Sequence, residues 1–526
     1  MVGKIHITPA LAAAFGAALY YYPAGLFGDG GLAGRIVFAV FFCAALVSFF
    51  RVLGEAPAFF FESRPSAVFP DGGAVRKKER DLSRVFRYTA RLAAAFALGV
   101  FIGAGARAAS PRGPFPGLPP ETVTAVSGML AEDPRTLQGG RGMGRVDLAY
   151  AVDGLGARAG ARGSLPVYFS EENLPRVKEF GRGCTVYVEG NFTSGTDAGA
   201  GGRPYFRAVS VHVTKAASPL EQLRTGVRQR IARLAEIADG GRDGWSGLSL
   251  ALLFGMKDTL DGDLAAAYRD AGCAHVLALS GMHLAVLSAM VVFLLKKPLG
   301  LRAAAVSCAV FVTAYVFVVG PQPSLNRAVI MYLLGTAAVL RGLHREPLNL
   351  LALSFLVQII LFPDSGTAVS FVLSYLALFG ILTIGEALHE LGRGGIPELI
   401  LGPLSASAGA FIAVAPVTAY WFGVLRPAGI AAGLLVVPLA TVFMALSIPV
   451  LFLAGIFPPA GRAVAAALSL LYRVQKGIVE LAAAAPGLSP GSAPALAASL
   501  ALTAVIFFFA YRVRRDRNRI PSFAGS

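Results

Sequence analysis

The chain has 526 residues, of which 55% are apolar and only 15% are charged. Soluble domains carry roughly 25% charged residues, so this composition excludes an ordinary soluble protein and indicates a polytopic membrane protein with some soluble mass. The formal charge of +16 does not by itself indicate nucleic-acid binding, because basic residues accumulate in the cytoplasmic loops of membrane proteins.

Three apolar runs long enough to cross a bilayer precede a polar region: Thr8–Phe27, Gly34–Leu53 and Tyr88–Ala108. The first has no clean small-x-small cleavage site, so we interpret it as a retained helix rather than a signal peptide. The loop Arg51–Arg91 holds nine basic and five acidic residues and is therefore expected in the cytoplasm. Three crossings then place the polar region outside the membrane, and the basic tail Arg512–Arg519 places the C-terminus inside.

The polar region Glu121–Ala216 has short β-branched and aromatic runs separated by glycine-rich turns. About five strands in fewer than 100 residues predict a small barrel or sandwich, and an OB-fold fits this count. Eleven basic and ten acidic residues leave the region nearly neutral. Several side chains are of types that stack on bases or bind phosphates, although alternate aromatics that simply fill the barrel would give the same pattern. These candidates are Tyr168, Phe169, Tyr187, Phe192, Arg203, Tyr205, Phe206 and Arg207.

The segment Leu220–Ile237 carries apolar residues at three- and four-residue steps, with arginines between them. This pattern is typical of an amphipathic helix. We expect the helix to lie on the outer membrane surface or to pack against the barrel, and a simple connector fits the pattern equally well.

Further apolar runs follow, and together with the first three they predict about 10–12 membrane helices. Among them Leu348–Phe362 is short, and Ala463–Ala485 is ambiguous because charged residues interrupt it. The complete set is Ala274–Leu295, Leu299–Gly320, Ser324–Leu340, Leu348–Phe362, Gly366–Gly385, Leu399–Trp421, Ile430–Ile456, Ala463–Ala485 and Ala493–Tyr511.

The predicted fold is thus a polytopic α-helical membrane protein with an inserted small all-β, OB-like extracytoplasmic domain. We expect N-terminal membrane helices in 1–110, the β-domain in 120–216, an amphipathic connector in 217–245, a membrane channel domain in 246–485, and a last helix with a basic tail in 486–526.

Several catalytic motifs are absent from the sequence. There is no GxxxxGK[ST] loop for ATP, no HExxH, and no HxH pair among the six histidines, so we expect no enzyme activity, no cofactor and no metal. The pair His275 and His283 is eight residues apart and would share a face of one helix, but it lacks further ligands. Four cysteines form no CxxC, and only Cys184 lies in the β-domain, which excludes a disulfide within that domain.

The stretch Asp270–Met290 is apolar but contains two histidines, two serines and a Gly-Met-His turn. Such polar groups are costly in hydrocarbon unless they face a partner or water, so the stretch is a candidate lining of a path. Ser280 and His283 also suggest a nucleophile and base, although the GxSxG elbow is absent. Mutual hydrogen bonding in a broken helix is the simpler interpretation.

A second polar site follows the break at Gly320–Pro323. Arg327 lies about one turn into an apolar run, so it either faces a cavity or an acidic partner, for which Asp364 is the natural choice, or extends to the outer interface. Serines interrupt Gly366–Gly385 in the same way. The candidates for a polar route are His275, Ser280, His283, Ser324, Asn326, Arg327, Asp364, Ser370 and Ser374.

Four motifs in this order resemble the ComEC family of competence DNA-uptake channels. The resemblance covers about residues 245 to 456 and, more loosely, the β-domain. Its motifs are Phe254-Gly255 through Leu277–His283, Pro323–Ala328 with Met331, Asn349–Leu361 followed by Pro363 and Ser370–Ser374, and Phe422-Gly423 through Pro438-Leu439.

The resemblance implies a channel that passes single-stranded DNA inward across the bacterial cytoplasmic (inner) membrane during natural transformation. It also implies a cytoplasmic ATP-driven motor and extracytoplasmic DNA-delivery proteins as partners. Many family members end in a metallo-β-lactamase-like domain whose HxHxDH ligands are missing here, so a nuclease step would belong to a separate protein. The alternatives are a transporter or channel for another polymer or solute, and an intramembrane hydrolase.

Overall fold

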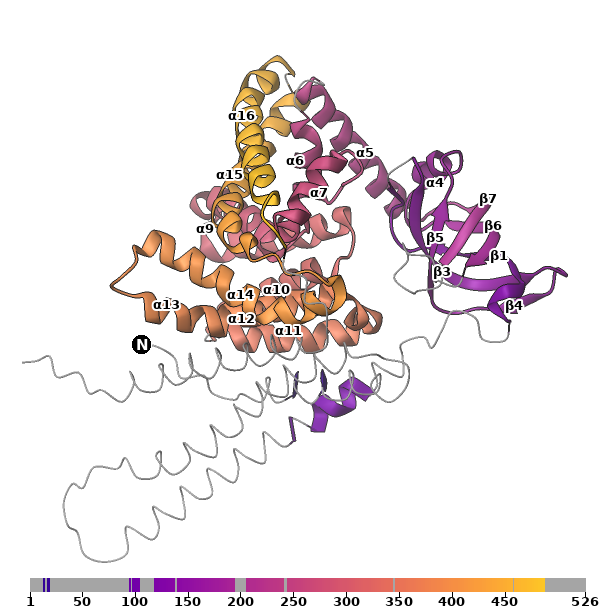
Figure 1. The fold of residues 1–526 in the computed structure, drawn as a ribbon, viewed down its shortest axis with the longest axis horizontal. Coiled ribbons are helices and arrows are strands. Elements are labelled where there is room, and N and C mark those ends of the chain that lie inside the picture. Colours follow the sequence, from indigo (N-terminus) through magenta and orange to yellow (C-terminus); the bar gives the residue numbers. More distant parts are fainter. Residues whose placement is uncertain are drawn as a thin grey trace, which may run out of the picture. The chain divides into compact units, whose positions relative to one another are not determined.

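The computed structural model describes residues 118–487, apart from 138–139, 194–204, 241–243, 344–345 and 457, together with 13–14, 17–18, 94–95 and 97–104 (Figure 1). The second and last predicted spans, the basic loop 51–91 and the tail 512–519 lie outside these residues. The chain forms two compact units. One comprises Met1–Ser110, Asn326–Leu434 and Pro486–Ser526, and the other comprises Pro111–Leu325 and Leu435–Ala485.

The second unit begins with a β-barrel whose strands alternate inward apolar and outward polar residues, as a barrel with one buried face requires. Val126, Leu130, Phe169 and Phe206 are at most 1% exposed and fill its interior. The main strands are β1 (Val123–Leu130), β3 (Gly142–Asp153), β5 (Ser164–Phe169), β6 (Thr185–Thr193) and β7 (Tyr205–Lys215), with the short strands β2 (Arg135–Thr136) and β4 (Arg158–Gly160) paired to β3.

The five main strands close on themselves in the order β1-β3-β5-β7-β6-β1. All pairs are antiparallel except β5–β7. Helix α4 (Leu174–Phe180) connects β5 to β6, and its Leu174 and Val177 enter the barrel core. A five-stranded Greek-key barrel of this kind is the OB-fold arrangement, so the prediction of an inserted OB-like domain is confirmed.

Helix α5 (Pro219–Asp239) follows the barrel and begins at Ser218, whose side chain accepts the Glu221 backbone N–H. Its apolar stripe is not its buried face in this structure. Leu220 and Leu223 are 65% and 63% exposed, whereas the Arg224 side chain is 1% exposed. The helix turns Arg224 and Arg228 inward because they find carboxylate and carbonyl partners there, which are described below.

Four further helices of this unit pack nearby: α6 (Trp245–Phe254) and α16 (Pro458–Ala483) contact α5, α7 (Gly262–Asp270) packs against α16, and α8 (Ala274–Leu277) packs against α6 and α7. Helix α16 is amphipathic, and its buried face carries Gln475, which donates to the Tyr268 hydroxyl at 2.5 Å. Helix α16 is not among the described helices that are apolar enough to span a membrane. It contains most of the run Ala463–Ala485, whose membrane crossing the sequence left open.

Helix α9 (Gly281–Val319) folds back on itself at Gly300, which has φ of +78° and follows Pro298. The Cys308 sulfur reaches the Ser288 carbonyl oxygen at 3.7 Å. In a straight helix these residues would be about 30 Å apart. The element is therefore an antiparallel hairpin of two helices, here called the α9 hairpin.

The first unit is a helical bundle with an aromatic core. Phe355, Phe371 and Tyr375 have ring centroids 4.7 to 5.7 Å apart. Gly380 and Gly409 let two of its helices touch through their backbones, since a Cβ at Gly380 would lie 2.4 Å from the Gly409 oxygen. The elements are α11 (Pro347–Leu361), η3 (Pro363–Thr367), α12 (Val369–Gly380), the π-helical turn η4 (Ile381–Gly385), α13 (Glu386–Gly392), α14 (Glu398–Phe422), most of α10 (Pro323–Leu340) and the start of α15 (Ala428–Ile456).

Within the described residues, five helices are long and apolar enough to cross a membrane, and the α9 hairpin is one of them. Helix α11 is apolar but short, as its sequence predicted. The prediction of a polytopic α-helical membrane protein is confirmed. The five are Gly281–Val319, Pro323–Leu340, Val369–Gly392, Glu398–Ala419 and Ala428–Ile456.

Candidate functional site

The start of the α9 hairpin is a polar turn built around Ser280 and His283. The Ser280 hydroxyl accepts the Met282 N–H at 3.3 Å, and the Ser280 N–H donates to His283 Nδ1 at 3.3 Å. The two side chains also meet, with Ser280 Oγ 3.0 Å from His283 Nδ1. This is a capping box, which satisfies backbone donors that the first helical turn leaves free.

The outer nitrogen of the same histidine has no such partner. His283 is 1% exposed, and its Nε2 makes no hydrogen bond within the described residues. Because Nδ1 accepts a backbone N–H, the neutral ring carries its proton on Nε2. A buried donor without a partner is costly, so this N–H is the unsatisfied group of the turn.

Three sequence motifs meet at this polar turn. The Ser324 hydroxyl donates to the Leu279 carbonyl at 2.6 Å. Gly255 has φ of +66°, and a Cβ there would lie 2.7 Å from Leu279 Cδ1 and 3.2 Å from Gln322 Nε2. The glycine is therefore required both by its backbone conformation and by the close approach of the other two segments.

His275 does not join His283 in a two-histidine site. Helix α8 ends at Leu277 and Ala278 is extended, so the two histidines lie on different helices, and His275 is exposed. The neighbouring Cys273 is buried, which raises the pKa of its thiol to about 11. Within the described part of the chain, no group of three His, Cys, Asp or Glu side chains is placed to hold a metal ion.

A second polar cluster, in the first unit, surrounds Arg327. Its Nη1 donates to the Ser374 carbonyl, and its guanidinium carbon lies 5.8 Å from the centre of the Tyr375 ring. Its Nε has no hydrogen-bond partner within the described residues, although the side chain is buried. The Tyr375 hydroxyl in turn donates to Gln358 Oε1 at 2.9 Å and lies 3.3 Å from Ser354 Oγ.

The other candidates of this unit have different surroundings. Asn326 is buried beside Arg327, whereas Ser370 is exposed. The side chain of Asp364 lies outside the described residues, so its proposed pairing with Arg327 stays a prediction. Gln358 and Ser354 were not singled out from the sequence. Both are fully buried polar residues in the short apolar run of α11. Two polar residues within an otherwise apolar run are the sequence feature that could have identified them.

The barrel presents a third group of side chains on the outer face of β3, β5 and β7. Tyr168 and Tyr205 meet edge to face, with ring centroids 4.9 Å apart. A shallow pocket beside them is lined by Glu132, Met143, Gly144, Arg145, Pro166, Tyr168 and Tyr205. Arg207 is exposed and pairs with Tyr168 in the register of the parallel strands. The face therefore combines two aromatic rings with two arginines, of which Arg145 was not singled out from the sequence.

The remaining aromatic candidates fall into inward-facing and outward-facing residues, because side chains alternate between the two faces of a strand. Phe169 and Phe206 are 1% and 0% exposed in the barrel core, so the interpretation of Phe169 as a stacking residue is wrong. Phe192 is only partly buried and packs against the same core. Arg203 lies outside the described residues.

Comparison with known proteins assigns the family. A family model described as "Competence protein" matches residues 252–515, which is half of the chain. The chain belongs to this competence protein family. The resemblance predicted from the four motifs is thereby confirmed, and the match contains both the polar turn and the Arg327 cluster.

A curated relative is similar over part of the same chain. ComE operon protein 3 of Bacillus subtilis (strain 168) is 24% identical over 198 residues, which cover 37% of this chain and 25% of that protein. The competence-family chain therefore matches only about a quarter of the length of this relative.

Proposed function

We propose that this competence-family protein takes part in DNA uptake during natural transformation and passes a single DNA strand inward across the bacterial cytoplasmic membrane. Family membership supports a role in competence. The helices long enough to span a membrane support a membrane path. The OB-like barrel supports a nucleic-acid partner, because this fold is used repeatedly to bind oligonucleotides.

The observation that carries the proposal is the outer face of the barrel. Tyr168 and Tyr205 offer ring surfaces on which bases of a single strand stack, whereas a duplex keeps its bases covered. Arg145 and Arg207 stand on the same face for the phosphates. The barrel is nearly neutral, so we expect weak binding with little dependence on salt.

The two polar clusters of the membrane part would line the path. DNA is a polyanion, so its route needs basic or dipolar groups and a water-filled lumen. His283 offers a free N–H, and Arg327 offers a buried cation with an unused Nε. We propose that His283 in one unit, and Arg327 and Ser374 in the other, each contribute a polar lining to the route of the strand.

The partners follow from the proposed role. Transport of a strand needs a source of force, for which we propose a cytoplasmic ATP-driven motor, and extracytoplasmic DNA-delivery proteins would load the barrel from outside. A nuclease that removes the second strand is a further proposed partner.

Uptake of labelled DNA by cells tests the proposal. Cells that lack the gene are compared with cells that carry it back on a plasmid, and nuclease-resistant label inside the cytoplasm is measured. We expect label inside the cytoplasm only in the cells that carry the gene on the plasmid. Equal internal label in both strains would contradict it and would favour a transporter for another polymer or solute on the same scaffold.

A further inference from the structure

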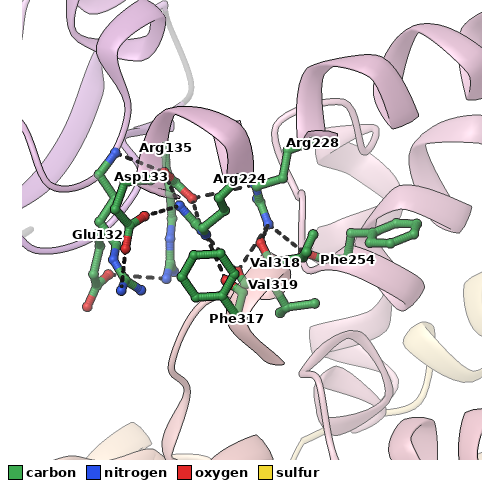
Figure 2. Close-up of polar contacts among 11 residues, drawn as sticks. Glu132, Asp133, Arg135, Arg224, Arg228, Phe254, Phe317, Val318 and Val319 are labelled. Atoms are coloured by element: carbon green, nitrogen blue, oxygen red, sulfur yellow. Dashed lines mark hydrogen bonds and ion pairs between the residues drawn. The ribbon is translucent and has the colours of Figure 1, made fainter. Parts of the chain in front are cut away.

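One carboxylate of the barrel is held by two arginines of α5. Asp133 follows the end of β1, and its two oxygens accept from Arg224 Nη1 at 3.1 Å and Arg224 Nη2 at 2.5 Å. Arg228 Nε lies 3.5 Å from the same carboxylate, and the Arg182 N–H donates to it at 3.1 Å (Figure 2). This two-pronged geometry is the strongest form of an arginine–carboxylate pair.

The same Arg224 also holds the far end of the α9 hairpin. Its Nε donates to the Phe317 carbonyl at 3.0 Å and its Nη2 to the Val319 carbonyl at 3.3 Å. The last carbonyls of a helix have no partner within the helix and carry its negative dipole. Arg224 therefore joins a barrel carboxylate to a helix end with one guanidinium group, and its side chain is 1% exposed.

Arg228 repeats this arrangement one turn later on α5. Its Nη1 lies 3.0 to 3.3 Å from the carbonyls of Phe254, Val318 and Val319, which end α6 and the α9 hairpin. Burial lowers the pKa of this guanidinium, the Asp133 carboxylate raises it and the Arg224 charge lowers it, and the net shift is downward. Asp133, together with Glu221, whose Oε2 lies 3.5 Å from Arg224 Nη1, thus supplies the negative charge that makes two adjacent buried cations tolerable.

A second contact joins the barrel to the helices nearby. Asp258, in the connection between α6 and α7, accepts the Thr136 N–H at 3.0 Å and the Lys178 ammonium at 2.7 Å. Lys178 also donates to the Thr136 hydroxyl at 2.7 Å. The connection that follows β1 is therefore fixed at two points only three residues apart.

Burying charges is a poor way to gain stability, because desolvation offsets most of the attraction. What such a cluster does supply is a defined geometry, since each guanidinium binds only where all its acceptors coincide. The carbonyls that it binds lie directly before Gly320, and Ser324 follows within one turn and holds Leu279 at the polar turn.

We propose that Asp133, Arg224 and Arg228, here called the arginine clamp, are positioning residues that fix the barrel relative to the outer end of the α9 hairpin. The clamp thereby presents a strand bound on the barrel at a constant position to the polar turn at Ser280–His283. This role rests on the proposed function in DNA uptake, but the geometry of the clamp has its own readout.

The test uses the full chain in nanodiscs with two spin labels, at Leu155→Cys on the barrel and Asp263→Cys on α7. Both positions are exposed, and the cysteines within the described residues are buried. The clamp predicts a narrow distance distribution that broadens in Asp133→Asn and in Arg224→Lys, which keeps its charge but loses the fork. Asp153→Asn is the matched control, because this barrel carboxylate accepts only the local N–H groups of Leu155 and Ala157.

Uptake and DNA binding are measured on the same variants. We expect Asp133→Asn to reduce uptake at least tenfold while single-strand binding by the purified protein stays unchanged. The double variant Asp133→Asn with Arg228→Gln should lose less uptake than the losses of the two single variants added together. Without the Asp133 carboxylate the two arginines repel each other, and removal of Arg228 relieves that repulsion. If the distance distribution of Asp133→Asn stays as narrow as that of the native protein, the clamp does not fix the barrel. If the distribution broadens but uptake stays normal, the clamp has no positioning role in uptake.

Failure of the proposed function looks different. If deletion of the whole gene leaves uptake intact, the function in DNA uptake is refuted together with the positioning role. The distance distributions then still decide whether the clamp fixes the barrel.

Discussion

The sulfur of Cys308 lies 3.7 Å from the carbonyl oxygen of Ser288, although the two residues are twenty positions apart in the sequence and lie on different arms of the α9 hairpin. The fold-back occurs at Pro298 and Gly300, directly after Lys296 and Lys297. Positive residues mark cytoplasmic ends of membrane helices. We therefore propose that both ends of the hairpin, with the polar turn and the clamped carbonyls, lie toward the opposite membrane face.

A cross-link tests this hairpin. In a background in which the other cysteines are serine, Ser288→Cys and native Cys308 should be joined by a short bifunctional maleimide. Trypsin cleaves between them after Lys296 and after Arg302, so the two fragments should stay together on a denaturing gel only after cross-linking. A straight helix would hold the residues about 30 Å apart, and separate fragments would contradict the fold-back.

The Asp133 carboxylate gives the clamp a defined pH dependence. Burial raises the pKa of Asp133. The hydrogen bond and charge of Arg224 and the charge of Arg228 together lower it by more, so the pKa of this carboxyl in the folded protein is below its ordinary value. A lowered folded-state pKa stabilises the protein above the unfolded value of about 3.9, and this stability is lost as pH falls through the folded-state value.

We therefore expect Asp133→Asn to lower the melting temperature of the purified protein by a constant amount between about pH 5 and 7. The difference from the native protein should shrink below about pH 4, because Asp133 then takes up a proton in the unfolded native chain but not yet in the folded one. Thermal unfolding across this pH series is the measurement. Asp153→Asn should show no such convergence, and a constant difference down to the lowest pH would contradict the clamp chemistry.

Hydropathy and alternation were enough to predict the fold. Long apolar runs identified the spanning helices, and period-two patterning identified the barrel. The same alternation, followed one step further, would have placed Phe169 inside, since Leu165 and Val167 precede it on β5 and are also buried. The signal was present, but a list of aromatic residue types does not distinguish inward from outward positions.

The arginine clamp could not be predicted in this way. Periodicity ranks the faces of a helix by apolar content, and on α5 it selects the face of Leu220 and Leu223, which is exposed. Arg224 is buried because its partners, Asp133 and Val319, come from positions more than ninety residues away in both directions. Only the folded chain brings a carboxylate and free helix carbonyls to one point.

The barrel face predicts a binding defect confined to single strands. Tyr168→Ala and Tyr205→Ala should each weaken single-strand binding by the full chain by roughly tenfold, because stacking contributes about 1–3 kcal/mol per base. Tyr187→Ala is the matched control, because this other candidate tyrosine faces outward on β6, away from the pair and its pocket, and should leave binding unchanged. Fluorescence anisotropy over a salt series should show a shallow slope, and a steep slope or tight duplex binding would refute this mode.

The guanidinium of Arg327 holds the Ser374 carbonyl and faces the Tyr375 ring. If this cation lines the DNA path, Arg327→Ala should abolish uptake while the protein still inserts and accumulates normally. Arg327→Lys keeps a positive charge and should retain part of the uptake, because the attraction of a polyanion depends more on the charge of the side chain than on the geometry of its donors.

Membrane-fraction immunoblots and labelled-DNA uptake separate the two roles open to this arginine. Loss of the protein in Arg327→Ala would mean that the residue is needed for folding, because removal of a buried cation leaves its acceptors without a partner. Arg302→Ala, at an exposed arginine just past the α9 turn, controls for general loss of positive charge. Full uptake in both Arg327→Ala and His283→Ala would remove these residues from the path, since the passing strand would then need neither the cation nor the free N–H.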